Sequence, residues 1–156
     1  MNKNACIHIT LPDDRPALKI ILDVNPAAIS TAQQKKIDFK HHLIFTDKRV
    51  AQGMKTIYNL ARPFASSVAS LVPHGHPAFL SVAFFHAYPQ GTPKHKLIEG
   101  VPMTAGADND NRIKAPQDAL VRAGFFSDDR FITSTHITKR RTIYSPRIEI
   151  VVANDI

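Results

Sequence analysis

The sequence lacks several features on which large classes of proteins depend. Its single cysteine, Cys6, excludes an internal disulfide and a zinc cage built from cysteines. No apolar run approaches the roughly 20 residues of a membrane-spanning helix, and residues 1–11 lack the apolar segment of a secretory signal. The glycine motifs that bind phosphates or dinucleotides and the serine hydrolase motif G-x-S-x-G are also missing. We therefore expect a protein without these chemistries, and the composition suits a soluble, bacterial or phage-encoded protein of the cytoplasm.

The composition that remains is typical of one basic, globular domain. Hydrophobic residues make up 44% of the 156 residues and charged residues 21%, which argues against disorder. Lysine and arginine number 20 against 13 acidic residues, so the net charge is +7. A basic domain of this size most often meets polyanions, nucleic acids first. We predict an N-terminal extension over residues 1–17 and a single domain over residues 18–156.

Apolar and β-branched runs predict the strands of a small mixed sheet. The densest run, residues 77–88, is apolar on both faces and is therefore expected to be central. The expected strands are residues 6–10, 18–24, 42–45, 77–88, 131–138 and 147–152. The last two are expected to form a hairpin through the basic, turn-like stretch 139–146. Residues 25–42 and 89–107 are expected to be loops.

Two main helices are expected between these strands. Val50, Met54 and Ile57 recur at helical spacing after Thr46 and Asp47, and Pro63 should end or kink that helix before a shorter one over residues 64–71. The second main helix is expected over residues 111–123, with Gly124 as its C′ residue. Pro116 falls about one turn in, which is tolerable if the first turn is irregular or if the helix properly begins near Lys114. The predicted fold class is α+β.

Five of the thirteen acids lie in one short stretch, namely Asp108, Asp110, Asp118, Asp128 and Asp129. Asp108 and Asp110 project to the same side of an extended segment, where their carboxylates repel each other. A divalent cation such as Mg²⁺ or Mn²⁺ relieves that repulsion with the hard oxygen ligands that it prefers. The alternative is an ordinary surface turn, because aspartate and asparagine favour turns in any protein.

Asp129 can join Asp108 and Asp110 only if the chain turns back, because a helix of about 12 residues is about 18 Å long. We expect the strand that begins near Phe131 to run antiparallel to the strand before Asp108 and so to return Asp129. Lys114 lies four residues before Asp118. It either forms an exposed ion pair with that acid or places a positive charge beside a phosphate that is being cleaved.

The stretch from Asp108 to Asp129 resembles the signature of the RusA-type Holliday junction resolvases. The family pattern D-x-D-N-x-x-K, then D-A-L, then a short glycine-bearing turn into D-D, is matched with every internal spacing kept. The rest of the chain, about residues 18–152, resembles the family only in the order of its elements. The resemblance implies a RusA-like fold and a crossover junction endodeoxyribonuclease. Such an enzyme works on branched DNA as a homodimer with Mg²⁺, for which Mn²⁺ can substitute.

The same resemblance assigns roles to residues of the motif. It implies that Asp108, Asp110 and Asp129 hold the metal and that Lys114 acts with them in catalysis. Supporting roles fall to the neighbouring polar residues Asn111, Asp118 and Asp128. Arg112 departs from the family, in which this position is often apolar.

Basic residues are the candidate contacts to DNA. They are Lys35, Lys36, Lys40, Lys48, Arg49, Lys94, Lys96, Arg112, Lys139, Arg140 and Arg141. Each cluster taken alone is equally an ordinary exposed turn. Together, in a domain of charge +7, they fit the tracking of phosphates, with an affinity that falls steeply as salt rises. The approximate two-fold symmetry of a four-way junction suits a two-fold dimer with two identical sites.

Three rival functions stay open at this point. The first is a DNA-binding protein that kept the fold without catalysis. The second is a nuclease for another structured nucleic acid such as RNA or flapped DNA, and the third is a basic subunit of a larger assembly.

Further residues are expected to be structural. The pairs His41-His42 and His74-Gly75-His76 lack an acid or cysteine at zinc-ligand spacing and are expected in surface loops. His86, Phe125 and Phe126 are expected to pack in or beside the core.

Overall fold

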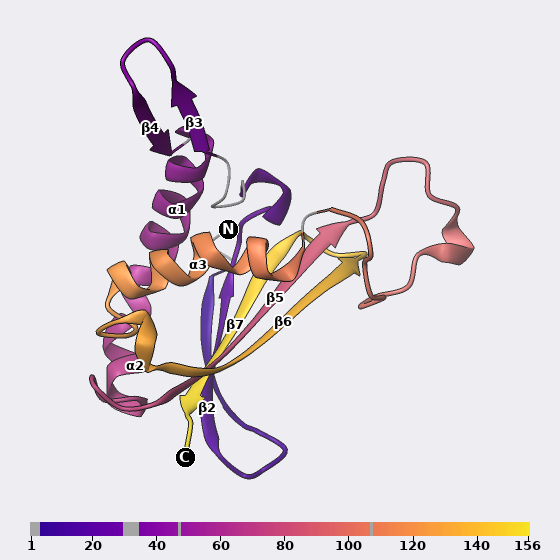
Figure 1. Ribbon diagram of the computed structural model, residues 1–156. Helices are drawn as coiled ribbons and strands as arrows, with labels where there is room; N and C mark the ends of the chain where they lie inside the picture. The colour runs from indigo at the N-terminus through magenta and orange to yellow at the C-terminus, as the bar shows by residue number, and fades with distance from the viewer. Residues whose placement is uncertain (1–3, 30–34, 47, 107) are drawn as a thin grey trace.

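The computed structural model describes residues 4–29, 35–46, 48–106 and 108–156. Its main sheet has five strands in the order β1-β2-β7-β5-β6 (Figure 1). Their bounds are Ala5–Thr10 for β1, Pro16–Leu22 for β2, Ala78–Ala87 for β5, Ile132–Thr142 for β6 and Arg147–Asn154 for β7. β5 and β6 are parallel, and the other neighbours are antiparallel. The predicted α+β fold with a mixed sheet is confirmed.

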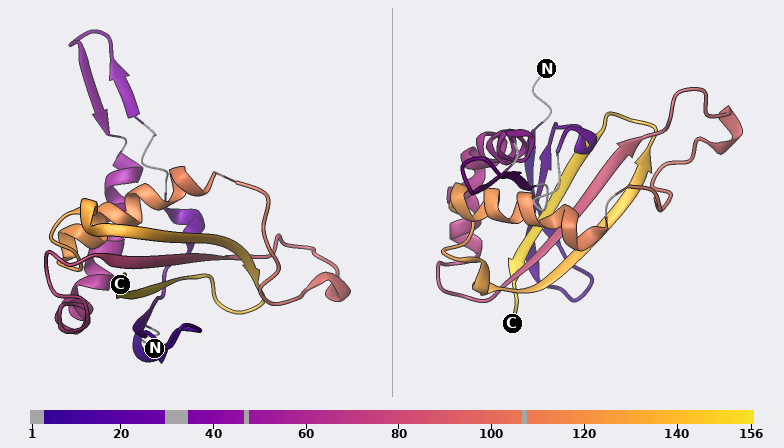
Figure 2. Two further views of the ribbon diagram at one scale, coloured as in Figure 1. Left: turned by 60° about the horizontal axis from the view of Figure 1, so that its bottom comes forward. Right: turned by 45° about the horizontal axis from the view of Figure 1, so that its top comes forward.

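Helices cover one face of this sheet, as two further views show (Figure 2). The helices are α1 (Lys48–Ala61), α2 (Ala65–Leu71) and α3 (Asn109–Ala123). Pro63 lies in a 3-10 turn, Arg62–Phe64, that separates α1 from α2, as its missing N–H group predicts. Within the part of the chain that the structure describes, no helix is long and apolar enough to cross a membrane.

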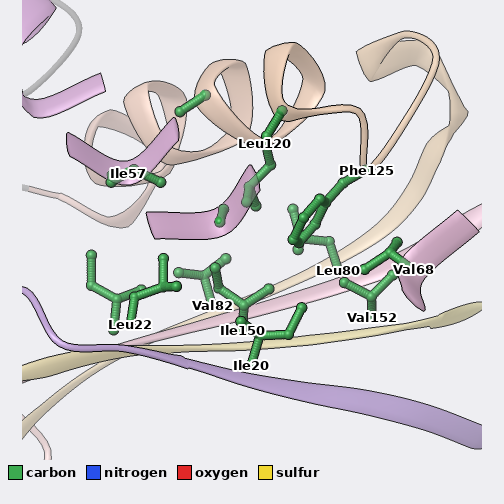
Figure 3. Packing of buried hydrophobic residues seen from close by; sticks show 14 of the residues in the cluster. Ile20, Leu22, Ile57, Val68, Leu80, Val82, Leu120, Phe125, Ile150 and Val152 are labelled. Atoms are coloured by element: carbon green, nitrogen blue, oxygen red, sulfur yellow. The ribbon is translucent and has the colours of Figure 1, made fainter. Parts of the chain in front are cut away.

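The core lies between this sheet face and the helices. Leu18, Ile20 and Leu22 of β2 are buried and alternate with half-buried residues, so one face of the strand points into the core. Figure 3 shows side chains of β2, β5 and β7 meeting those of the helices. Phe125, which follows α3, is fully buried, and Phe126 is nearly so. The prediction that this pair packs beneath the helix is therefore confirmed.

A second, two-stranded sheet lies beyond the first turn of α1 (Figure 1). It consists of β3 (Lys35–Asp38) and β4 (Leu43–Thr46), which pair in antiparallel fashion. The expected loop over residues 25–42 is therefore wrong in part, because it includes β3 and a 3-10 turn, Pro26–Ala28. The Asp38 carboxylate accepts the N–H groups of Lys40 and His41 and so stabilises the turn that makes β3 possible.

The predicted hairpin between the last two strands is wrong. β5 lies between β6 and β7, and the residues Lys139, Arg140 and Arg141 belong to β6 rather than to a turn. The difference follows from polarity. β7 buries alternate apolar residues and takes the central place, whereas β6 consists mostly of polar residues that are exposed or half-buried and takes the edge. Alternation along a strand predicts its buried face but not its neighbour.

The helix α3 begins at Asn109, two residues earlier than predicted, so Pro116 lies in its interior rather than in the first turn. A proline there removes a hydrogen bond to the carbonyl four residues back, at a cost of about 3 kcal/mol. Pro116 is buried together with Ala115 and Ala119. Burial of this apolar face offsets part of that cost.

Candidate active site

The first turn of α3 presents the first two acids of the motif. Asp108 is the N-cap residue with an extended backbone, and Asp110 lies in the first turn. Both side chains are exposed. In the described part of the chain, neither carboxylate takes part in an ion pair or a side-chain hydrogen bond. The positive end of the helix favours both charges. We call these two residues the N-terminal acidic pair.

The residues around the N-terminal acidic pair hold it against the sheet. The amide of Asn109 donates to the carbonyl of Ile137 in β6 over 3.2 Å. The Oδ1 atom of Asn111 is buried and has no hydrogen-bond partner among the residues that the structure describes. Lys114 is exposed one turn beyond Asp110, on the same helix face. The structure shows no ion pair between Lys114 and Asp118, so the lysine charge is not neutralised by that acid.

The other motif acids lie at the opposite end of α3. Gly124 ends the helix in a left-handed conformation, with φ of 92°. Asp128 then caps a 3-10 turn, Asp129–Phe131, and accepts the N–H of Arg130 over 3.0 Å. That hydrogen bond, and next a hydrogen bond with Asp129, lower the pKa of Asp128. We call Asp128 and Asp129 the C-terminal acidic pair.

The C-terminal acidic pair borders an open depression of about 370 Å³. Its lining consists of Asp118, Val121, Arg122, Asp128 and Asp129. Asp118 shows how far the depression lies from the N-terminal acidic pair. It follows Asp110 by eight residues of helix, which is about 12 Å along the axis. A metal ion binds its oxygen ligands at about 2.0–2.6 Å. The two acidic pairs of one chain are therefore too far apart to share an ion.

The expected antiparallel return after Asp129 is wrong, because β6 runs parallel to β5. The chain turns at the C-terminal end of α3 and starts β6 there, so Asp129 stays at that end. In the described residues, no three histidines, cysteines or acids gather in a group that could hold a metal ion. One chain thus presents two separate acidic pairs, one at each end of α3.

A part-buried contact joins Arg112 in the first turns of α3 to His86 of β5. The Nη1 atom of Arg112 is 3.1 Å from Nε2 of His86, and its guanidinium lies 5.7 Å from the ring centre of Phe84. Burial, followed by the charges of Arg112, Arg141 and Lys139, lowers the pKa of His86 to about 4. His86 is therefore neutral at pH 7 and accepts the hydrogen bond. The prediction of a buried, satisfied histidine is confirmed.

Gly106 leaves the space that Arg112 occupies. Its φ is +86°, and a Cβ atom there would lie 2.5 Å from Nη2 of Arg112. The buried Nε atom of Arg112 has no hydrogen-bond partner within the described ranges 4–29, 35–46, 48–106 and 108–156. The sequence reasoning missed this contact. Two features of the sequence could have indicated it. Arg112 stands at a position of the motif that is often apolar in the family, and His86 lies in an otherwise apolar strand.

Three of the predicted DNA contacts lie on β6, near the N-terminal acidic pair. The guanidinium groups of Arg140 and Arg141 donate to the carbonyls of Gly100 and Ala87, at 2.7 and 2.9 Å. Lys139 donates to the carbonyl of Ala105 over 3.4 Å. The acceptors of Arg140 and Arg141 carry no net charge, so these two hydrogen bonds hold the guanidinium groups in place without neutralising them.

The remaining predicted contacts are spread over the surface. Lys94 and Lys96 are exposed in a 3-10 turn, Lys94–Lys96, of the loop before α3. Lys40 is exposed at the turn between β3 and β4, and Lys48 and Arg49 are exposed at the start of α1. The backbones of Lys35 and Lys36 belong to β3, and their side chains lie outside the described part. The histidines His41, His42, His74 and His76 are exposed, as predicted.

One comparison with known proteins bears on this arrangement. The family model described as Endodeoxyribonuclease RusA matches residues 25–153. The chain belongs to the RusA endodeoxyribonuclease family. The match confirms the resemblance seen in the motif and extends it to most of the chain. Membership of the RusA family implies an endonuclease that acts on Holliday junctions. A search of curated proteins found no match.

Proposed function

We propose that this protein is a metal-dependent endodeoxyribonuclease that resolves four-way DNA junctions by paired, symmetric nicks during recombination and repair. The observation that carries the proposal is the placement of the RusA motif on α3. Asp108 and Asp110 stand exposed at a helix N-terminus with uncommitted oxygens, and Lys114 follows on the same face. Catalysis needs such uncommitted groups, whereas a merely structural cluster would engage them with neighbours.

We further propose that two copies of the chain complete each metal site. The two acidic pairs of one chain lie at opposite ends of α3. Two copies related by a two-fold axis, with their α3 helices antiparallel, would bring the N-terminal acidic pair of one copy to the C-terminal acidic pair of the other. An isologous contact of this kind creates two identical sites. Two sites match the two strands that must be cut in a four-way junction.

The donor set fits a hard divalent cation. Asp108, Asp110 and Asp129 would offer carboxylate oxygens, which suit Mg²⁺ and Mn²⁺. When bound, such an ion supplies Lewis-acid chemistry that activates water and offsets charge on the reacting oxygens. Asp128 positions Asp129 by capping the turn that begins at Asp129, where it accepts the N–H of Arg130. Lys114 places a positive charge where negative charge develops on the phosphate.

A synthetic four-way junction tests this function. We expect the protein to nick the junction symmetrically with Mg²⁺ and to bind it without cutting when Ca²⁺ replaces Mg²⁺. Asp110→Asn is expected to abolish cutting and to leave binding within about two-fold. The matched control is Asp23→Asn, an exposed aspartate that follows β2 and lies outside the motif. Wild-type cutting by Asp110→Asn would refute the site assignment.

A DNA-binding protein without catalysis is the second candidate, because the basic residues of β6 do not depend on the acids. It predicts the same complex in Ca²⁺ and in Mg²⁺ and no nicks in either. The cutting assay separates the two candidates directly.

A further inference from the structure

Exposed apolar side chains gather where the loop before α3 meets the turn between β6 and β7. In the turn, Ile143 is 48% exposed and Tyr144 is 68% exposed. In the loop, Ile98 is 59% exposed, and Val101 is also exposed. We call these four residues the apolar tip. Figure 1 shows the loop and the turn at the same end of the sheet.

Hydrogen bonds fix the apolar tip in place. The Oε2 atom of Glu99 accepts the N–H of Ile143 over 2.9 Å and the hydroxyl of Thr142 over 3.0 Å, which joins the loop to the turn. Gly100 donates to the carbonyl of Arg141, and Arg141 donates to the carbonyl of Val101, at 2.9 and 2.8 Å. The loop therefore runs along the edge of β6 like an added strand. A surface held in this way loses little further freedom when a partner binds.

The charges around the apolar tip indicate a polyanionic partner. The sequence of residues 88–106 contains one acid, Glu99, and that of residues 132–150 contains one, Glu149. Both lie within ion-pair distance of Arg147, at 3.9 and 2.8 Å. Among the described residues, no ion pair joins an acid to Arg140, Arg141, Lys94 or Lys96. Arg140 and Arg141 donate to carbonyls, and Lys94 and Lys96 are exposed. A second copy of this face would set cations against cations, so it is a poor partner.

The apolar tip lies at a defined distance from the N-terminal acidic pair. Asn109 is bonded to Ile137 of β6, and Ile143 follows six residues later. Six residues of a strand span about 20 Å, which is about six nucleotide steps of DNA at about 3.4 Å each. The cations of β6 lie between the two ends of this path. A DNA strand that lies along β6 therefore reaches both the acids and the apolar tip.

We propose that the apolar tip stacks on bases exposed at the branch point of the junction and thereby distinguishes branched from linear DNA. This inference rests on the proposed function. Isoleucine and valine side chains have no group that binds a phosphate, but they pack against the faces of bases, and the ring of a tyrosine stacks on them. Those faces are covered in an intact duplex, where insertion costs a few kcal/mol for each step that is unstacked. At a branch point the stack is already interrupted, so the contact forms there preferentially.

The test measures binding by the full-length protein in Ca²⁺ to a four-way junction with 2-aminopurine at the branch point. A linear duplex of the same arm sequence is measured in parallel. Tyr144→Ala is expected to weaken junction binding about 10-fold, to leave duplex binding within two-fold, and to lose the change in 2-aminopurine fluorescence. Tyr144→Phe, which keeps the ring, is expected to behave as wild type.

A second pair of variants controls for general effects of lost apolar surface. Ile143→Ser is expected to weaken junction binding selectively. Ile7→Ser on β1, at the opposite edge of the sheet, changes a residue of similar exposure (46%) and is expected to leave both affinities unchanged.

Three results would overturn the inference. They are equal loss of junction and duplex binding in Tyr144→Ala, no loss in either, and a loss that tracks a change in oligomeric state, which would make the apolar tip a contact between copies. Failure of the proposed function looks different. In that case the wild-type protein itself neither cuts junctions in Mg²⁺ nor prefers them to duplex in Ca²⁺.

Discussion

Gly124→Ala is expected to destabilise the protein more than the same change at Gly91. Both glycines have a left-handed backbone, with φ of +92° and +85°. A side chain in that region costs about 1–2 kcal/mol at either position. At Gly91 nothing lies within 4 Å of the added Cβ atom, whereas at Gly124 it would meet Nη1 of Arg62 at 3.2 Å. The guanidinium of Arg62 also donates to the last carbonyl of α3, that of Ala123, over 2.9 Å.

The added cost at Gly124 is therefore the weakening of that hydrogen bond. A hydrogen bond from a charged donor contributes about 1.5–3 kcal/mol, of which a small displacement loses a part. We expect an extra loss of about 1–2 kcal/mol, or a Tm about 2–8 °C below that of Gly91→Ala. Thermal unfolding followed by circular dichroism measures both variants. Equal Tm values for the two would refute the reasoning, because they would show that the contact with Arg62 contributes nothing.

Two further predictions concern the core and the buried histidine. Phe125→Ala is expected to lower the free energy of unfolding by about 3–5 kcal/mol, because its side chain is fully buried, whereas the exposed Phe39→Ala changes it by about 0.5 kcal/mol or less. Urea unfolding measures both, and similar losses would contradict the core described above. His86 has a pKa of about 4 in the folded state and an ordinary value of 6.5 when unfolded, so the unfolded chain binds more protons between these values. Stability should therefore fall as the pH drops from 6.5 to 4. His86→Gln, which keeps an acceptor for Arg112, should make that fall shallower, and an unchanged slope would show that His86 does not cause it.

The sequence predicted the parts of this fold that local signals control. The spacing of Val50, Met54 and Ile57 and the position of Pro63 place α1 and its end, because helix periodicity and the missing N–H act within a few residues. Gly124 marks the end of α3 for the same reason. The acids and Lys114 could be proposed as a site because their spacing along the chain is itself the motif.

The pairing of strands could not be predicted in the same way. Arg147–Asn154 and Ile132–Thr142 each alternate, and alternation predicts the face of a strand but leaves its neighbours open. The insertion of β5 between them, parallel to β6, depends on long-range packing. The position of Asp129 follows from that topology, so the sequence did not reveal that the two acidic pairs occupy opposite ends of α3.

Mixing two inactive variants tests most directly whether each active site takes residues from two copies. Asp110→Asn and Asp129→Asn are each expected to be inactive. In a mixed dimer with shared sites, one site carries both substitutions and the other carries none. Co-expression in equal amounts should therefore restore nicking to about one quarter of the wild-type rate.

The matched control is the mixture of Asp108→Asn with Asp110→Asn. Both substitutions lie in the N-terminal acidic pair, so every site of a mixed dimer keeps one of them and no activity should return. Recovery in the first mixture but not in the second is the result that a shared site predicts. If the mixture of Asp110→Asn and Asp129→Asn, with mixed dimers shown to form, stays as inactive as its components, the shared site is contradicted.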